Sequence, residues 1–142
     1  MSIKDTDKLL TELTEEQNIK NFLGLNANEL TELNLAIFLK SLLLNKNLKK
    51  AAVINNSGLD KTYAYHIFSG TKQPSRPKIL AIGISMQLTL DEMQHLLLHA
   101  HLNILYPRNK WDAIIIVAIK QKFSVIETNS LLEQLNETLL LY

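Results

Sequence analysis

Cationic side chains gather in the middle of this 142-residue chain. Residues 40–78 hold eight lysines and arginines against Asp60 alone, a net charge of +7, whereas residues 1–39 carry −4 and residues 79–142 carry −2. The whole-chain charge of +1 conceals this segregation. A cationic block between acidic arms can bind an anionic partner, such as the phosphates of a nucleic acid. A lysine-rich surface that contacts only solvent would have the same charges, so the motifs near these lysines must distinguish it from a surface that binds an anionic partner.

A second group of residues with chemical potential is Glu92, His95 and His99, spaced i, i+3 and i+7 along one helical face. That spacing could hold a divalent metal ion, but a solvent-facing stripe has the same pattern, and we expect no metal site. The chain has no cysteine, and it contains no Walker, nucleophile-elbow or dinucleotide-binding motif. We therefore expect no enzyme activity and no cofactor.

The spacing of apolar residues predicts helices along almost the whole chain, and no strand pattern competes. The expected helices cover about 6–22, 28–44, 49–56, 61–68, 75–86, 89–104, 111–118 and 125–135. Residues that favour helix starts precede them: Asn28, Asp60, Ser75, Thr89 with Glu92, Asn109, and Ser124 with Glu127. Pro77 falls in a first turn, where its missing N–H costs little. The fold class is predicted to be all-α.

Residues 50–67 fit a helix-turn-helix, because two short helices are joined by a turn that contains Gly58. Residues 35–97 also resemble, without a gap, the lambda-repressor/Cro-like (XRE family) helix-turn-helix domain of bacterial and phage regulators. The matching positions are Leu48, Lys50, Val53, Gly58, Leu59, Asp60, Ile67, Gly70, Pro74 and Ser75, followed by Ile79, Leu80, Ile82, Met86, Leu88, Thr89, Leu90, Asp91 and Glu92. The resemblance implies a five-helix lambda-repressor-like domain, here with extra N-terminal and C-terminal helices in one compact unit.

The chain departs from the family pattern at four positions. Ile54 stands where the family usually has alanine, and Ala64 stands where it has a β-branched residue. These positions face each other in the family, so the exchange keeps the core volume. Ser57 replaces a usual leucine, which we expect to loosen the core. Lys50 replaces a usual glutamine, so we do not expect the base contact that the family's glutamine makes, and the lysine adds a positive charge that can bind a phosphate.

The resemblance implies that residues 61–68 form a recognition helix in the major groove of double-stranded DNA. The expected base contacts are Lys61, Thr62, Tyr65 and His66, although packing against the following loop is an alternative for Tyr65 and His66. The expected phosphate contacts are Lys49, Lys50, Thr71, Lys72, Gln73 and Arg76. Six such contacts predict a slope of about −5 for log K against log[salt].

Three regions follow from this assignment: an acidic helical extension at 1–28, the helix-turn-helix domain at 29–104, and a helical tail at 105–142. The tail resembles that of a group of Firmicute helix-turn-helix proteins of unassigned role, which share a segment like residues 62–70. Residues 114–117 make one tail helix apolar nearly all round, so other helices or a second subunit must bury it. Because repressor operators are commonly palindromic, we favour a homodimer that uses the tail, while an intramolecular bundle accounts for the same residues.

The sequence thus predicts a sequence-specific DNA-binding transcriptional regulator, of the repressor type. The alternative is a protein–protein interaction module in which the same fold binds an antitoxin-like or signalling partner. No apolar run approaches the roughly 20 residues that a bilayer crossing needs, and the first residues do not resemble a signal peptide. Together with the absence of cysteine, these features lead us to expect a cytoplasmic protein without a membrane partner.

Overall fold

A computed structural model describes residues 34–141 of the chain. Over those residues the protein is all-α, as predicted, with seven helices and no strand. The helices are α4 (Leu35–Asn45), α5 (Lys50–Ser57), α6 (Lys61–Ser69), α7 (Arg76–Ser85), α8 (Leu90–His99), α9 (Lys110–Lys120) and α10 (Val125–Gln134). The predicted helix at 6–22, the cap at Asn28 and the acidic extension at 1–28 lie outside the described residues.

Short polar side chains begin most of these helices. In five helices the side chain of the N-cap residue accepts a hydrogen bond from a backbone N–H of the first turn. These N-cap residues are Asn34 in α4, Asp60 in α6, Thr89 in α8, Asn109 in α9 and Ser124 in α10. Both predicted capping boxes are confirmed, with Glu92 and Glu127 returning a hydrogen bond to the N-cap backbone. The predicted caps at Asp60, Thr89, Asn109 and Ser124 are thus confirmed. The predicted start at Asn28 is wrong, because the extended backbone of Asn34 precedes the first residue of α4.

Helix α8 is shorter than predicted. It ends at His99 instead of near Ile104, and His101 then adopts a φ of 58°. This left-handed conformation takes the backbone off the helical path, and residues 102–106 continue without regular structure. Leu105 is nevertheless buried, so the apolar spacing that suggested a longer helix comes from a packed loop.

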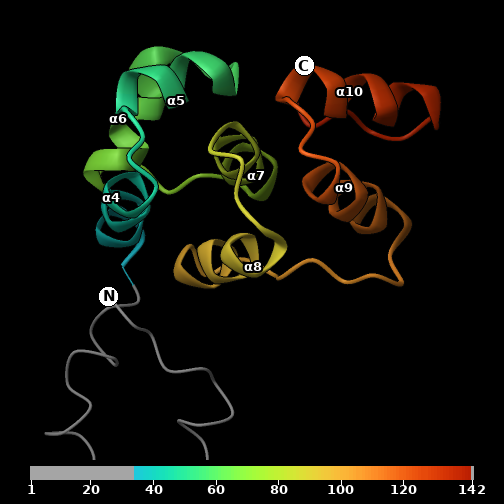
Figure 1. Ribbon diagram of the computed structural model, residues 1–142, viewed down its shortest axis with the longest axis horizontal. Helices are drawn as coiled ribbons and strands as arrows, with labels where there is room; N and C mark the ends of the chain where they lie inside the picture. The colour runs from blue at the N-terminus through green and yellow to red at the C-terminus, as the bar shows by residue number, and fades with distance from the viewer. Residues whose placement is uncertain (1–33, 142) are drawn as a thin grey trace, which may run out of the picture.

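Helices α7 and α8 lie between two groups of helices, with α4–α6 on one side and α9–α10 on the other (Figure 1). Helix α7 packs against α5, α8 and α10, and α8 packs against α4, α7 and α9. Buried side chains from every described helix form one hydrophobic cluster that runs from Leu35 to Leu140. Helices α4–α8 and the tail therefore share their core.

A glycine and the hydrogen bonds of a buried serine stabilise the turn between α5 and α6. Gly58 adopts a left-handed φ of 76°, a conformation that costs glycine little. Ser57 is fully buried, and its hydroxyl donates to the carbonyl of Ile54 (2.7 Å) and accepts from the amide of Leu59 (3.2 Å). The serine expected to loosen the core thus holds the turn by hydrogen bonds. Ile54 and Ala64 are both buried in α5 and α6, which pack together.

The tail is buried mainly by its own chain. In α9, Ile114, Ile115 and Ile119 are buried, while Val117 is 48% exposed. The last described residues return to the core, because Leu140 is only 2% exposed and Asn129 binds the backbone of Leu140 and Leu141. Over residues 34–141, no helix has the length and apolarity needed to span a membrane.

Candidate nucleic-acid interface

Helix α6 has one face in the core and one face outside. Ala64, Ile67 and Phe68 are buried against α4 and α5, the helices that α6 packs on. The opposite face is exposed and consists of Lys61, Thr62, Tyr65, His66 and Ser69. All four predicted base-contacting residues therefore lie together on this surface, which we call the α6 face. Ser69 belongs to it as well, and the spacing from Thr62 and Tyr65 could have identified it.

The start of α6 is set by Asp60. Its carboxylate accepts the amide of Tyr63 at 3.0 Å and so caps the helix. Lys61 and Thr62 follow as the first two residues of the helix, and both are exposed. Tyr65, one turn further along, is 45% exposed. The cap therefore presents a cation, a hydroxyl and a phenol on adjacent positions of one rigid element.

His66 is held by the loop that follows α6. Its Nδ1 lies 2.8 Å from the hydroxyl of Thr71, which in turn lies 3.0 Å from the hydroxyl of Ser69 and donates to the carbonyl of His66. The amides of Thr71 and Lys72 also donate to that carbonyl. Because Nδ1 is engaged within the protein, Nε2 is the ring nitrogen that can reach a ligand. Thr71, predicted to contact phosphate, therefore positions His66.

Three of the four predicted phosphate-contacting cations are open to solvent. Lys49 and Lys50 begin α5, and Lys72 lies in the loop after α6 together with the exposed Gln73. The Nζ of Lys50 lies 5.9 Å from the ring centroid of Phe68, which places this cation beside α6. Lys50 and Lys72 therefore place positive charge near the C-terminal end of α6.

Arg76 is directed elsewhere. Its guanidinium donates two hydrogen bonds to Asp112 of α9, both at 2.9 Å, and it also donates to the carbonyls of Asn103 and Ile104. Burial would raise the pKa of Asp112, but the hydrogen bonds from Arg76 and the Tyr106 amide, with the charge of Arg76, outweigh that effect and lower it. We therefore leave Arg76 out of the candidate interface, and the interface has five of the six predicted phosphate contacts.

Two other cations of the central block are also partnered. Lys46 forms an ion pair of 2.9 Å with Glu92, and Lys78 lies 4.3 Å from the ring centroid of Tyr63. Burial would raise the pKa of Glu92, but hydrogen bonds from Lys46 and from the backbone and side chain of Thr89, with the charge of Lys46, lower it. The +7 block is thus divided between structural contacts and an exposed set around α6.

The acidic and histidine stripe on α8 is not a metal site. His99 is 1% exposed, its ring stacks on Phe38 at 4.0 Å, and its Nδ1 lies 2.8 Å from the carbonyl of His95. The expectation of a solvent-facing stripe is wrong at this position, because α4 covers it. Across residues 34–141, no three histidine, aspartate or glutamate side chains are placed to hold a metal ion.

No family model, curated protein or solved structure matches this chain. The candidate interface therefore rests on the geometry and chemistry of its own residues.

Proposed function

We propose that this protein is a sequence-specific, double-stranded DNA-binding transcriptional regulator and that α6 is its recognition helix. The observation that carries the proposal is the α6 face, an exposed polar surface with exposed lysines nearby, on a helix whose other side is anchored by α4 and α5. The tail helices α9 and α10 pack on α7 and α8, which keeps them from covering α6. The major groove of B-DNA is wide enough to admit such a helix.

The lambda-repressor/Cro-like type is the form of the fold that we propose for α4–α8. Helices α5 and α6 are joined by residues 58–60, with left-handed Gly58 in the turn and the Asp60 cap at the start of the second helix. That connection is typical of a helix-turn-helix. In this type the second helix presents its N-terminal residues to the base edges, which are here Lys61 and Thr62.

The residues on the α6 face divide by chemistry. Lys61 can donate to O6 or N7 of guanine, and Thr62 can bond to a base or cover a thymine methyl. His66 reaches a base edge through Nε2, with Thr71 holding its other nitrogen. Lys49, Lys50 and Lys72 neutralise phosphates and set the register of the helix on the duplex, with Thr71 and Gln73 adding uncharged contacts.

A binding selection tests the proposal. The full chain is incubated with a genomic fragment library at about 100 mM salt, and the bound fragments are sequenced for wild type, Lys61→Ala and His66→Ala. Wild type is expected to enrich a short motif, and either substitution is expected to reduce that enrichment by about tenfold, since a good base contact contributes roughly 1–3 kcal/mol of discrimination. Arg108→Ala, which removes an exposed cation of the loop between α8 and α9, is the matched control and should leave the motif unchanged.

Uniform, weak retention that neither substitution alters would contradict the proposal. It would leave only non-specific charge attraction, and the alternative of a protein–protein interaction module would then be favoured. A further variant, Thr71→Val, tests whether His66 reads its own positions of the motif. It removes the hydroxyl that holds Nδ1 of His66, so the positions read by His66 should lose preference while those read by Lys61 keep it.

We further propose that the protein acts as a homodimer through α9 and α10. Large apolar side chains remain exposed on these helices, with Val117 at 48%, Ile126 at 80% and Leu135 at 41%. A second copy could cover them and would present two α6 faces to a palindromic site. Light scattering at micromolar concentration is expected to give twice the chain mass of 16.2 kDa, and a mass of one chain would exclude the dimer.

A further inference from the structure

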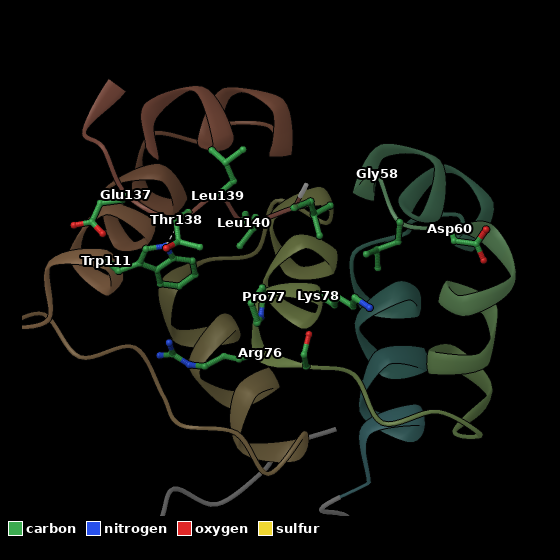
Figure 2. A pocket seen from close by; sticks show the side chains of 13 residues that line it. Gly58, Asp60, Arg76, Pro77, Lys78, Trp111, Glu137, Thr138, Leu139 and Leu140 are labelled. Carbon is green, nitrogen blue, oxygen red and sulfur yellow. Dashed lines mark hydrogen bonds between the residues drawn. The ribbon is translucent and has the colours of Figure 1, made fainter. Parts of the chain in front are cut away.

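A groove of about 680 Å³ lies between the helix-turn-helix and the tail (Figure 2). Three segments far apart in sequence line it: the turn at 58–60, the start of α7 at 75–78, and the tail at 137–141 with Trp111 of α9. Its volume lies within the roughly 300–1,000 Å³ range of pockets that bind drug-sized molecules. The groove adjoins the start of α6, because Asp60 lines it and directly precedes Lys61, but Lys61, Thr62, Tyr65 and His66 are not among its lining residues.

The groove is mostly apolar, and its walls are held in place. Leu59, Pro77, Trp111 and Leu139 line it and are half-buried. Trp111 donates its indole N–H to the carbonyl of Thr138 at 2.8 Å, which fixes the ring against the tail. On the same tail, Asn129 accepts the amide of Leu140 at 2.7 Å and donates to the carbonyl of Leu141 at 3.0 Å. Such a preorganised apolar surface lowers the ordering cost of binding a ligand.

The charges that line the groove are not equivalent. Arg76 is neutralised by Asp112, and Glu137 lies 3.5 Å from Lys110. Asp60 is committed to the start of α6 as its cap. Lys78 is in no ion pair within residues 34–141, and its Nζ lies 4.3 Å from the ring centroid of Tyr63. Lys78 is therefore the cation of the lining that an anionic ligand can pair with, while the Asp60 carboxylate keeps its own charge at 3.0 Å from the Tyr63 amide.

We propose that this groove binds an elongated aromatic organic monoanion, with its ring system against Trp111 and its anionic group at Lys78. In the view of Figure 2, Trp111 and Lys78 lie on opposite sides of Pro77, a third residue of the lining. A ring system can stack on Trp111, and a carboxylate or sulfonate can accept a charge-assisted hydrogen bond from Lys78. This proposal does not rest on the proposed DNA-binding function.

Two fluorescent probes of nearly the same shape test the charge requirement. 8-Anilinonaphthalene-1-sulfonate carries one sulfonate, and N-phenyl-1-naphthylamine is its uncharged counterpart. Titrated against the full-length protein without DNA, the sulfonate is expected to bind one per chain and about tenfold more tightly than the neutral probe, the ratio that one charge-assisted contact supplies. Equal affinities, or no saturable binding of the sulfonate, would overturn the proposal.

Variants of Lys78 assign that preference to the groove. Lys78→Met keeps the apolar stem and removes the charge, so it should weaken the sulfonate by about tenfold and leave the neutral probe unchanged. Lys78→Arg should restore sulfonate binding, and Lys120→Met, on the far part of α9, should have no effect. Thermal melting of each variant checks that the fold persists. A sulfonate affinity that Lys78→Met does not change would also overturn the proposal.

The location can be read from Trp111 because the chain has a single tryptophan. Its indole N–H gives one resonance in a ¹H–¹⁵N correlation spectrum of the uniformly labelled protein. An aromatic ring that stacks on Trp111 should shift this resonance in step with the fluorescence titration. A saturating titration that leaves the indole resonance in place would show that the probe binds elsewhere, and the proposed groove would be excluded.

Discussion

Arg76 and Asp112 join α7 to α9. Two hydrogen bonds of 2.9 Å connect the guanidinium at the first residue of α7 with the carboxylate in the first turn of α9. The Asp112 side chain is 8% exposed and that of Arg76 is 23% exposed. The same carboxylate accepts the amide of Tyr106, and Arg76 also binds two carbonyls of the intervening loop. One ion pair thus organises the connection between α8 and α9.

The first prediction concerns the stability that this pair supplies. Asp112→Asn is expected to lower the free energy of unfolding by about 3 kcal/mol, because it leaves the charge of Arg76 partly buried without a counter-ion. Urea unfolding of the purified chain at pH 7 measures the change. Asp91→Asn is the matched control, since the Asp91 side chain is 89% exposed, and it should cost less than about 0.5 kcal/mol. Equal costs for the two variants would contradict the role assigned to Arg76.

The second prediction follows from the lowered pKa values of Asp112 and Glu92. A carboxyl whose pKa is lower in the folded protein binds protons more readily when unfolded, so its stabilisation is fully present above the unfolded pKa and is lost as the pH falls through the folded pKa. The ordinary values are 3.8 for Asp112 and 4.5 for Glu92. These two groups should therefore leave the stability unchanged above about pH 5.5 and reduce it at lower pH.

Unfolding at pH 6, 4 and 3 separates the two contributions. The difference between wild type and Asp112→Asn should shrink as the pH falls, because protonation of Asp112 removes from wild type the negative charge that the variant already lacks. Glu92→Gln should act in the same direction while preserving the capping geometry, which glutamine also supports. A difference that stays constant from pH 6 to pH 3 would show that these carboxylates are not the source of the pH dependence.

The third prediction concerns Gly58 and Leu141. A Cβ atom at Gly58 would lie 3.3 Å from Cδ1 of Leu141, and the glycine φ is +76°. Gly58→Ala should therefore cost about 2 kcal/mol, of which roughly 1 kcal/mol is backbone strain. In a Leu141→Ala background the contact is removed, and the cost should fall toward the strain alone. Urea unfolding of the four proteins in this cycle measures the coupling.

Gly70 is the control for that cycle. It has a φ of +86°, and a Cβ there would lie 3.4 Å from Cβ of Ala36, at the near edge of ordinary contact. Gly70→Ala should have the same cost with and without Leu141→Ala. If Leu141→Ala left the cost of Gly58→Ala unchanged, the tail would not be packed on the turn in solution.

The fourth prediction concerns salt and rests on the proposed DNA-binding function. Only charged contacts release counter-ions, and Arg76 is occupied by Asp112, so three phosphate contacts remain, from Lys49, Lys50 and Lys72. For each bound chain, the contribution to the slope of log K against log[salt] should be about −3, shallower than six contacts per chain would give. Lys72→Met should change the slope by about 0.9 for each bound chain. Fluorescence anisotropy on the selected DNA between 50 and about 200 mM salt measures both slopes.

Arg108→Met provides the matched control for the salt experiment, because that exposed cation lies in the loop between α8 and α9. Its slope should equal that of wild type. If Lys72→Met and Arg108→Met had the same effect on the slope, DNA would be responding to the overall charge of the protein instead of to the cations beside α6.

The features predictable from the sequence were those that neighbouring residues decide. Four of the predicted N-caps, including both capping boxes, begin helices as expected, because a side-chain oxygen reaches amides only two or three residues away. The exposed face of α6 followed from the helical period for the same reason, with Lys61 and His66 on one side and Ile67 on the other. The cap of α4 was missed, since Asn34 begins that helix and Asn28 was predicted. The end of α8 was missed because a packed loop continued the apolar spacing.

The tertiary fold decided the partners of charged and aromatic groups. Arg76 was predicted to contact phosphate, but it is hydrogen-bonded to Asp112, 36 residues later in the sequence. His99 was expected to face solvent, but Phe38 of α4 stacks on its ring. The groove likewise exists only where the α5–α6 turn, α7 and the tail meet. The helical period indicates which side of a helix is apolar. The contact partner of a polar side chain, however, depends on how helices distant in sequence pack against one another. That arrangement is determined by packing of the whole core.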